Sequence, residues 1–577
     1  MSKKVLAVVL SLILAFSVVA VPVGAADITL PETSVENVFY MFIDKLISVV
    51  LTYLNKYWPG YDSKWDTEED YVADYFYEGE SEFDREVADG AEWKLGYAGA
   101  SLLEGIDATC GDYFLAGSLE PIVGRVPTKV IDDQRVRVYA ISDGVSGTVV
   151  HAVIDGFGLS RGDVQIIRER MAEFAEENNV ISINVSVLHQ HSCIDTLGMN
   201  VPLAQALIMN TGNAALGGLL DDQKVQKNQQ FMESLYAKTV YAMKRAVKNM
   251  KAGTLSYGYA DITEYVKDKR DPQSMNTNIN RLRFVPEDGT SETWILEAAM
   301  HCTSIGAGPD ELTADYPYYI EKTIREDYGA NVVFVIGAEL AITSRDIYLC
   351  KDCGSIADVE ITKNKTTIAC PEACCEAVSA KEIGEAADLW NELNRDETKD
   401  DFELMADFGY IIAQKTIAID NDVELEPVLN ITHEEVALKV DNEILTLAAR
   451  EDVLNPVIVK TSDDYNLITE IGYMELGNKV AVFLCPGEFE PALVYGGPES
   501  GDASWTGDEW SLPALKDCTD CEYVMVYGLC NDQAGYVLKD NEYHSLLTDN
   551  EEVNVISKTA GSTIVNEYVG ILGELAA

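Results

Sequence analysis

The chain has 577 residues, of which 47% are hydrophobic and 24% charged, and these are ordinary proportions for a soluble globular protein. Its charge balance is unusual, because 43 lysines and arginines stand against 96 aspartates and glutamates, which gives a net charge of −53. A field of that sign repels phosphate backbones, so the composition argues against a nucleic-acid partner and favours solubility and the accumulation of cations.

The first residues carry the pattern of a secretory signal peptide. Two lysines precede an apolar run from Val5 to Val21, and small residues follow it. We expect cleavage after Ala25 or Ala26, so that residues 1–25 are the signal and the protein is secreted or held at the extracellular surface. An uncleaved membrane anchor is the alternative, because the apolar run is nearly long enough to span a bilayer.

Residues 26–91 are predicted to form an N-terminal helix followed by an acidic linker. Thr33 and Glu36 have the spacing of a capping box, which predicts a helix that ends near Tyr57, before Pro59. We expect its apolar face to pack on the main domain. Peripheral membrane contact is the alternative, although the helix lacks the basic residues of a surface-binding helix.

Residues 92–577 are predicted to form one large catalytic domain of the α/β class, in mixed α+β form, with a mixed β-sheet flanked by helices. No repeat or Gly/Ser-rich linker divides this part of the chain. Alternating and buried apolar runs predict the strands 136–143, 147–155, 180–188, 278–285, 294–300, 331–336, 424–431, 466–473, 479–484 and 522–527. Amphipathic periodicity predicts the helices 160–177, 223–251, 313–328, 380–394 and 401–415.

Histidine is scarce, and its placement suggests a metal site. The six histidines of the chain are His151, His189, His191, His301, His433 and His544. His189 and His191 directly follow the predicted strand 180–188, and His301 ends the strand 294–300. In contrast, His151 is expected in the core, and His433 and His544, which have acidic neighbours, are expected at the surface.

Further candidate ligands follow two later strands. Glu488 comes after strand 479–484, and Tyr536 comes after strand 522–527. Ligands at the carboxyl ends of strands are where sheet-based folds build sites. Two imidazoles, one carboxylate and an open position make a standard hydrolytic zinc site, which acidifies bound water to a pKa of about 7 and polarises a carbonyl group.

Taken one at a time, the same residues have structural interpretations. His189 and His191 can be strand-end histidines with satisfied hydrogen bonds, and Glu488 can be an acid at a helix N-terminus. Tyr536 can be an aromatic residue of an edge strand. We prefer the metal site because the histidines and Glu488 each follow a predicted strand, so that their side chains can meet at one end of the sheet.

Four motifs together resemble the neutral ceramidase family, the neutral and alkaline non-lysosomal ceramidases. They occur in the family's order, and the similarity extends from about Trp93 to about Tyr543, over the family's catalytic domain. The motifs are His189-x-His191-Ser192, Met300-His301-x-Thr303-Ser304, Pro486-Gly487-Glu488-Phe489 and Asn531-Asp532-x-x-Gly535-Tyr536.

The resemblance implies a zinc-dependent amidohydrolase that cleaves the N-acyl bond of ceramide, an amide-containing lipid. It implies Zn²⁺ as the cofactor, with His189, His301, Glu488 and Tyr536 as the ligands. His191 would lie beside the metal and assist proton transfer. Tyr536 or Thr343 would stabilise the oxyanion.

The sequence departs from the family at two places. Cys193-Ile194-Asp195-Thr196 stands where the family has Gly-Pro-Gly after the serine of the first motif. Thr343, with Ser344 adjacent, takes the place of an active-site serine, and the preceding Gly-Asp pair is lost. Two alternatives therefore stay open: a metal-dependent hydrolase of another exported amide or ester, and a non-catalytic surface protein that retains the fold, in which the candidate ligands would lie apart.

Two cysteine clusters are separate from these motifs. In the Cys-rich insertion 350–375, the clustered residues are Cys350, Cys353, Cys370, Cys374 and Cys375. Their spacing resembles a zinc ribbon, but two disulfides are an equal alternative in an exported protein. Cys518, Cys521 and Cys530 pose the same question. We expect both cysteine clusters to hold loops together rather than to catalyse a reaction.

Other catalytic classes are not favoured. Ser160 is placed as a helix cap, which argues against a serine hydrolase. No phosphate-binding or dinucleotide-binding loop precedes a helix. No pattern in the sequence indicates an oligomeric state.

Overall fold

The structure is a computed structural model. It describes residues 65–117, 124–201, 227–270, 273–304, 310–344, 348, 350–353, 357–362, 365–381, 383–394, 401–450, 452–462, 464–497, 509–543 and 554–575. The predicted signal peptide 1–25, the predicted helix that ends near Tyr57 and His544 lie outside the described residues.

A nine-stranded mixed sheet forms one half of the molecule. Its strands run in the order β11, β9, β8, β6, β1, β3, β4 and β5, with β16 paired to β6. The pairs β4–β5 and β9–β11 are parallel, and the other pairs are antiparallel. The strands are β1 Lys94–Ser101, β3 Arg135–Ser142, β4 Thr148–Ile154, β5 Val180–Val187, β6 Lys251–Asp261, β8 Asn278–Pro286, β9 Thr293–Ala298, β11 Asn331–Ile336 and β16 Val423–Leu425.

A second, five-stranded sheet packs against the first. Its order is β17, β19, β20 and β22, with β18 paired to β19, and β20–β22 is its parallel pair. Apolar side chains of both sheets, such as Ile183 of the first and Val482 of the second, belong to one buried core. The strands are β17 Leu429–Lys439, β18 Ile458–Lys460, β19 Tyr465–Leu476, β20 Val480–Leu484 and β22 Tyr523–Tyr527.

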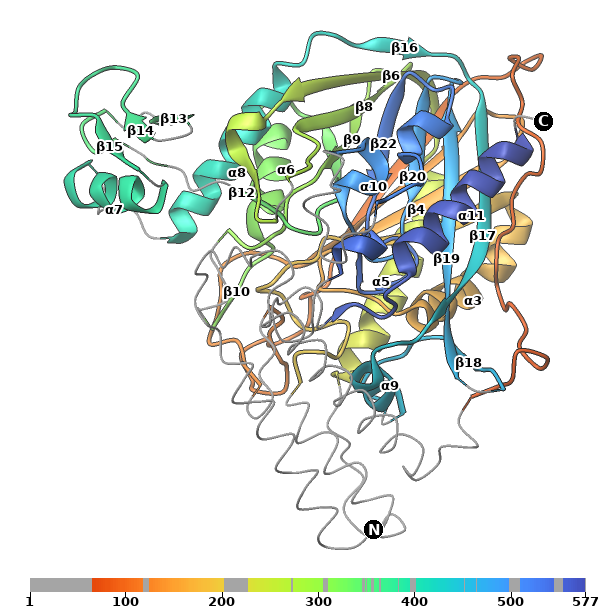
Figure 1. The fold of residues 1–577 in the computed structure, drawn as a ribbon. Helices are drawn as coiled ribbons and strands as arrows, with labels where there is room; N and C mark the ends of the chain where they lie inside the picture. Colours follow the sequence, from red (N-terminus) through yellow and green to blue (C-terminus); the bar gives the residue numbers. More distant parts are fainter. Residues whose placement is uncertain are drawn as a thin grey trace, which may run out of the picture.

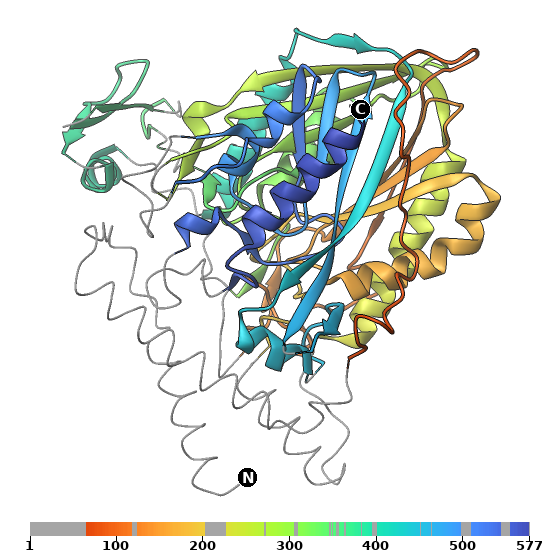
Figure 2. The same cartoon turned by 45° about the vertical axis from the view of Figure 1, so that its right-hand side comes forward.

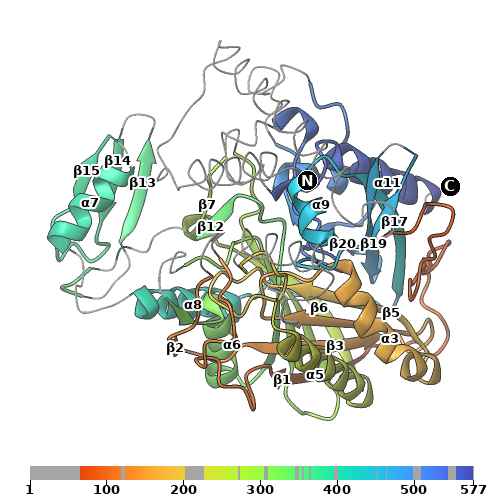
Figure 3. The same cartoon turned by 90° about the horizontal axis from the view of Figure 1, so that it is seen from below.

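Helices cover the outer faces of both sheets, which gives four layers (Figures 1 and 3). α3 and α5 lie on the nine-stranded sheet beside β3, β4 and β5, and α6 with α8 lies beside β11. α11, at the blue end of the colour bar, lies on the far side, against β17 (Figure 2). The bounds are α3 Arg161–Glu177, α5 Gln229–Lys248, α6 Asp315–Asp327, α8 Asp401–Ile417, α9 Glu443–Arg450, α10 Pro491–Tyr495 and α11 Ala560–Leu575. The mixed α+β class predicted from the sequence is confirmed.

The strand that leads to the candidate site follows directly from its sequence. β5 reads VISINVSV and is buried over nearly its whole length, as expected for a strand covered on both faces. Asn179, with φ of 51°, ends the preceding helix α3 in the left-handed region that asparagine tolerates. β5 therefore begins at once and runs parallel to β4.

The region around residue 251 corrects one prediction. The helix predicted for 223–251 is α5, Gln229–Lys248, and the residues KAGTLSYGYAD after it form β6, which was not predicted. β6 contains Gly253 and Gly258, where an added Cβ would meet neighbouring atoms closer than 3.0 Å. Glycines that admit such close packing interrupt the alternation of apolar and polar side chains by which a strand is recognised.

Shorter elements complete the described chain. β2 Lys129–Val130 pairs with β10 Glu311–Leu312, β7 Val266–Asp268 with β12 Ile342–Ser344, and β21 Glu488–Phe489 with β23 Tyr536–Val537. The Cys-rich insertion 350–375 and the residues that follow it, up to 394, form a separate three-stranded sheet with one helix: β13 Asp358–Thr362, β14 Lys365–Ala369, β15 Val378–Ala380 and α7 Ile383–Asn394. The 3₁₀ turns are η1 Thr263–Tyr265, η2 Leu515–Cys518 and η3 Asp540–Glu542.

Within the described part of the chain, no helix is both long enough and apolar enough to span a bilayer.

Candidate metal centre

His189 lies two residues after Val187, the last residue of β5. Its backbone is in the left-handed conformation, with φ of 53°. Its Nδ1 lies 2.7 Å from the carbonyl oxygen of Phe157, so Nδ1–H donates to that carbonyl and the lone pair is on Nε2. That Nε2 lies 3.3 Å from Glu488 Oε2. Burial lowers the pKa of His189 to about 4, which keeps the ring neutral near pH 7.

His301 follows β9 and presents its ring in the same way. Its Nδ1 lies 3.0 Å from the carbonyl oxygen of Glu339 and 3.1 Å from that of Ile342, and its Nε2 lies 2.9 Å from Glu488 Oε2. A histidine whose Nδ1–H is bound to a carbonyl has its Nε2 fixed and available to a cation.

Glu488 joins the two histidines. It starts β21, directly after Gly487, whose φ of 81° turns the chain into the site. Its Oε2 lies between the two imidazoles, and its Oε1 accepts a hydrogen bond from Gln533 at 2.9 Å. Burial by itself would raise the pKa of Glu488, but His189 and His301 in their protonated form, together with the hydrogen bond from Gln533, outweigh burial and lower that pKa.

These contacts bring three electron-pair donors to one point. Both rings use Nδ1–H for backbone carbonyls, so in their neutral form the two Nε2 lone pairs and Oε2 face one another. A cation between three such atoms removes their mutual repulsion. In a tetrahedral zinc site with bonds of about 2.0 Å, neighbouring ligand atoms lie about 3.3 Å apart. The distances from Glu488 Oε2 to the two Nε2 atoms, 3.3 Å for His189 and 2.9 Å for His301, are close to that value. The residues therefore fit a zinc ion.

His191 lies beside this point. Its ring centroid is 4.7 Å from that of His189 and 5.8 Å from that of His301, and the three side chains offer ring nitrogens within 4.8 Å of one another. Among the described residues, its buried Nε2 has no hydrogen-bond partner. Burial, followed by the two neighbouring histidines, lowers the pKa of His191 well below its usual value.

Tyr536 and Thr343 lie next to the ligand set through strand pairing. Tyr536 of β23 is the register partner of Glu488 in a parallel ladder, and Thr343 of β12 forms a parallel bridge with His301. Paired residues place their side chains on the same face of a ladder, about 5 Å apart. The backbone thus brings both hydroxyl-bearing residues to the edge of the site.

Glu339 is a further residue of the site, and sequence reasoning did not select it. Its side chain is fully buried, and both carboxyl oxygens lack a hydrogen-bond partner among the described residues. Glu339, His301 and Glu488 offer ligand atoms within 4.8 Å of one another. Burial, and then the charge of Glu488, raises its pKa well above its usual range. The signal that could have identified it is an acid three residues beyond β11, a strand that is apolar after its first residue.

The remaining motif residues hold the loops in place. Asn531 Oδ1 accepts from the backbone N–H of Val185 at 3.0 Å, and Asp532 Oδ1 accepts from that of Arg161 at 2.9 Å. Both bonds fasten the loop after β22 to the β5 side of the site. Gln533 in the same loop orients Glu488, so this motif positions ligands rather than supplying all of them.

The segment that departs from the family pattern forms a structured turn. Asp195 accepts hydrogen bonds from the backbone N–H groups of Leu197, Gly198 and Asn200 at 2.8 to 3.0 Å. Thr196 Oγ1 donates to the carbonyl of Gly158 at 2.7 Å. The replacement residues therefore have an internal structural role beneath the histidine pair.

Two predictions for other histidines have different outcomes. His151 is buried, as predicted, with its Nε2 3.0 Å from Ser186 Oγ. The surface position predicted for His433 is wrong, because its side chain is buried with Nε2 3.0 Å from Asn184 Oδ1. Successive residues of β17 point to opposite faces, so acidic Glu434 is exposed while His433 faces the nine-stranded sheet.

Ser160 serves as a helix cap, as predicted. It lies in the stretch Gly158-Leu159-Ser160-Arg161-Gly162, which has the G-x-S-x-G spacing of serine hydrolases. Its backbone N–H donates to Asp163 Oδ2 at 3.2 Å, and its Oγ accepts from the backbone N–H of Asn455 at 3.3 Å. Ser160 is thus the N-cap residue, and its side chain holds the loop at Asn455.

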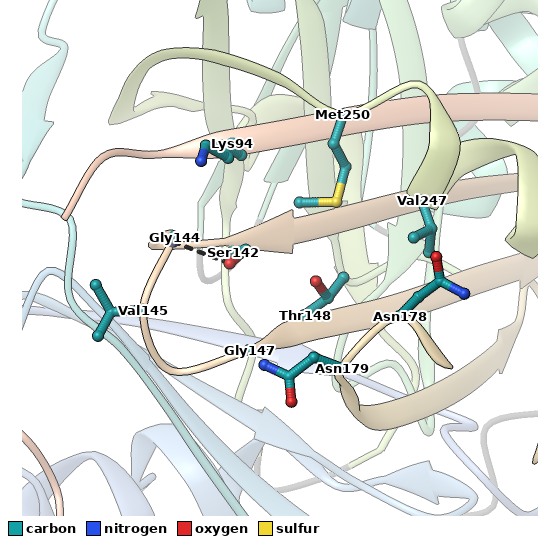
Figure 4. Close-up of a pocket in the computed structure, with 10 residues that line it drawn as sticks. All are labelled: Lys94, Ser142, Gly144, Val145, Gly147, Thr148, Asn178, Asn179, Val247 and Met250. Atoms are coloured by element: carbon teal, nitrogen blue, oxygen red, sulfur yellow. Dashed lines mark hydrogen bonds between the residues drawn. The ribbon is translucent and has the colours of Figure 1, made fainter. Parts of the chain in front are cut away.

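A shallow cavity has a volume of about 280 Å³. Its lining residues, drawn in Figure 4, include none of the metal centre. Lys94, Ser142, Thr148 and Asn179 are among its lining residues. Thr148 begins β4 and Asn179 precedes β5, so the cavity lies at the amino ends of these parallel strands. Sites in such sheets form at the carboxyl ends, where His189 lies.

Two solved structures have the same fold, and both are ceramidases. The crystal structure of neutral ceramidase from Pseudomonas aeruginosa matches with a TM-score of 0.57 and 13% identity, over 85% of this chain and 75% of that chain. A ceramidase complexed with C2 matches with a TM-score of 0.55 and 12% identity, over 84% and 75%. Comparisons with known families and with curated proteins find no match. At this identity the similarity establishes the fold, and the predicted resemblance to neutral ceramidases is confirmed at that level.

Proposed function

We propose that the protein is an exported, zinc-dependent amidohydrolase that cleaves the N-acyl amide bond of a ceramide-like lipid. The convergence of His189, His301 and Glu488 on one point carries this proposal. The shared fold with neutral ceramidases supports it. Export rests on the N-terminal sequence pattern alone.

The zinc ion would be held by His189, His301 and Glu488, with Tyr536 as the fourth ligand implied by the family resemblance. When bound, zinc polarises a carbonyl group and acidifies water. Second-sphere contacts keep the ligands in place: the Phe157, Glu339 and Ile342 carbonyls fix the two rings, and Gln533 fixes the carboxylate.

Proton transfer falls to His191 in this proposal. Its Nε2 is next to the ligand rings and has no partner among the described residues, so it can accept a proton from the attacking water. The hydroxyl groups of Thr343 and Tyr536 would donate to the developing oxyanion. Glu339 would add a second carboxylate to the cation site.

The second candidate is hydrolysis of a different exported amide or ester at the same site. The turn built by Asp195 and Thr196, and Thr343 in place of the family serine, favour this alternative, because they alter the surroundings of the ligands and leave the ligands themselves in place. The non-catalytic alternative predicts ligands that lie apart, and the observed convergence argues against it.

Metal analysis and a substrate panel test the proposal. We expect the purified protein to contain stoichiometric zinc at this site and to hydrolyse fluorogenic N-acylsphingosine faster than other N-acyl amides and esters. His301→Ala should abolish both zinc binding at this site and hydrolysis. His433→Gln, at a buried histidine outside the site, is the matched control and should retain both.

The outcomes separate the alternatives. Zinc binding with faster turnover of a non-sphingoid amide or ester would select the second candidate. A protein that binds no zinc at this site, or an unchanged rate in His301→Ala, would reject the metal mechanism altogether.

A further inference from the structure

The Cys-rich insertion forms a small unit of its own. β13, β14, β15 and α7 stand beside the main body in both views (Figures 1 and 3). Its ends are joined by the backbone N–H of Lys351, which donates to the carbonyl of Asn394 at 2.9 Å. The metal centre described above draws no residue from this unit.

Five cysteines meet at one end of this unit. Cys350 and Cys353 precede β13, and Cys370 directly follows β14. A tight turn, in which the Ala373 N–H donates to the Cys370 carbonyl at 2.9 Å, then returns the chain to Cys374. The two spacings, C-x₂-C and C-x₃-C, are those of zinc-binding loops.

The sulfur atoms form a mutual cluster rather than isolated pairs. Cys374 Sγ lies 3.4 Å from both Cys350 Sγ and Cys370 Sγ, and Cys353 Sγ lies 3.5 Å from Cys370 Sγ. All four sulfurs lie within 4.8 Å of one another. A tetrahedral zinc ion with Zn–S bonds of about 2.3 Å separates its sulfurs by about 3.8 Å. Two disulfides would instead give two pairs at about 2.05 Å with no need for contact between the pairs.

The size of the unit supplies a reason for a metal. Among the described residues, its own buried cluster has eight members, two of which are cysteines at the site: Tyr348, Cys350, Ala357, Ile368, Cys370, Val378, Ala386 and Trp390. A unit this small cannot bury enough apolar surface to be stable alone, and such units are commonly held by a metal or by disulfides.

We propose that Cys350, Cys353, Cys370 and Cys374 bind a structural zinc ion. The site holds four thiolates and no position for substrate, which is the composition of a structural site. Cys353 and Cys374 are exposed, so a chelator or an alkylating reagent can reach it from solvent. Cys375, whose Sγ lies 3.2 Å from Cys350 Sγ, is the neighbour left outside the ligand set.

Metal stoichiometry of the full chain tests this site independently of the proposed activity. In a His301→Ala background, which empties the catalytic centre, we expect one bound zinc per chain. Cys370→Ser should lose that zinc, whereas Cys375→Ser should keep it. If Cys375→Ser loses the ion and Cys374→Ser keeps it, the assignment of the fourth ligand is overturned.

Two measurements on the unmutated cluster keep the proposal testable if Cys370→Ser does not fold. Replacement of zinc by cobalt should give the charge-transfer absorption of a thiolate-bound, tetrahedral ion. Alkylation of the denatured, unreduced chain in the presence of a chelator should modify all four cysteines. Absence of the thiolate–cobalt band, or protection of these cysteines until a reductant is added, would overturn the proposal in favour of disulfides.

Discussion

At the level of single residues, the candidate metal centre contains two buried carboxyl groups, those of Glu488 and Glu339. Glu488 contacts both imidazoles, whereas Glu339 has a carboxyl oxygen within 4.8 Å of ligand atoms of His301 and Glu488 but no hydrogen bond from its carboxyl oxygens to any described residue. An isolated buried carboxyl group is costly unless a cation or a proton neutralises it. The raised pKa of Glu339 means that a proton neutralises it when no metal is bound, and a cation bound by this group could take the place of that proton.

The two carboxyl groups should differ in their effect on metal affinity. We expect Glu488→Gln to weaken zinc binding at least ~100-fold, because a direct ligand charge is lost, and Glu339→Gln by ~10-fold. Competition with a fluorescent chelator measures both constants. Glu434→Gln, at an exposed glutamate of β17, should leave the affinity unchanged. Equal constants for wild type and Glu339→Gln would show that Glu339 plays no part in holding the ion.

Glu297 of β9 gives a prediction about stability and pH. Its carboxyl group is fully buried with Asn280 as its hydrogen-bond donor, and burial raises its pKa to about 8. In the unfolded chain the ordinary value, about 4.5, returns. The folded state therefore binds the proton more tightly, so this group's contribution is fully present below pH ~4.5 and is lost as pH rises towards 8.

Glu297→Gln should remove this dependence. We expect wild type to lose on the order of a few kcal/mol of unfolding free energy from this group between pH ~4.5 and ~8, and the variant to lose less. Denaturant titrations at several pH values provide the measurement. Parallel pH profiles for the two proteins would contradict the assignment of a protonated Glu297.

At the level of elements, strand ends and tight turns decide where the ligands point. His191 follows β5, and the neighbouring Gly117 has φ of 100° and lies so close that an added Cβ would be 2.0 Å from the His191 carbonyl oxygen. No side chain fits there without moving the histidine pair. Gly111 has a similar φ of 92° but has no atom within 4 Å of an added Cβ.

This pair of glycines separates backbone strain from displacement of the site. Both Gly117→Ala and Gly111→Ala force alanine into a left-handed conformation, which costs on the order of 1 kcal/mol. Only Gly117→Ala should also reduce zinc affinity and hydrolysis, by ~100-fold for a shift of about 1 Å. Thermal unfolding and kinetics of both variants test this expectation. Equal losses of activity would attribute the effect to strain alone.

The elements that the sequence predicted well are those with one clear signal. β5 has an apolar residue at every second position between a cap and a turn, and β11 is apolar after its first residue. α3 has Ser160 and Asn179 at its ends. β6 was missed because glycine replaces side chains at close contacts with Val285 and Asp422. Local patterns report side chains, and they do not report the tertiary contacts that select glycine.

The candidate site shows the same division. His189, His301 and Glu488 could be selected because each follows a recognisable strand and belongs to a motif. Glu339 could not, because its role depends on the turn after β11 bringing it to His301, which is a tertiary event. His433 was misplaced because acidic neighbours on a strand say nothing about the opposite face.

At the scale of the whole molecule, residues from both sheets contribute to the candidate metal centre. The nine-stranded sheet delivers the histidines after β5 and β9, and the five-stranded sheet delivers Glu488 and Tyr536 after β20 and β22. The shared core between the sheets therefore holds together candidate site residues that lie far apart in the sequence, up to 347 positions for His189 and Tyr536.

The net charge of −53 gives a final prediction about a lipid substrate. A strongly negative protein is repelled by an anionic membrane surface, and salt weakens that repulsion because the Debye length falls from about 10 Å at 0.1 M to about 3 Å at 1 M. We expect hydrolysis of N-acylsphingosine to be several-fold faster in zwitterionic vesicles than in vesicles with anionic lipid at low ionic strength. The difference should shrink as salt is added. A rate that is higher in anionic vesicles and falls with salt would show that a local cationic surface, rather than the net charge, governs the approach to lipid.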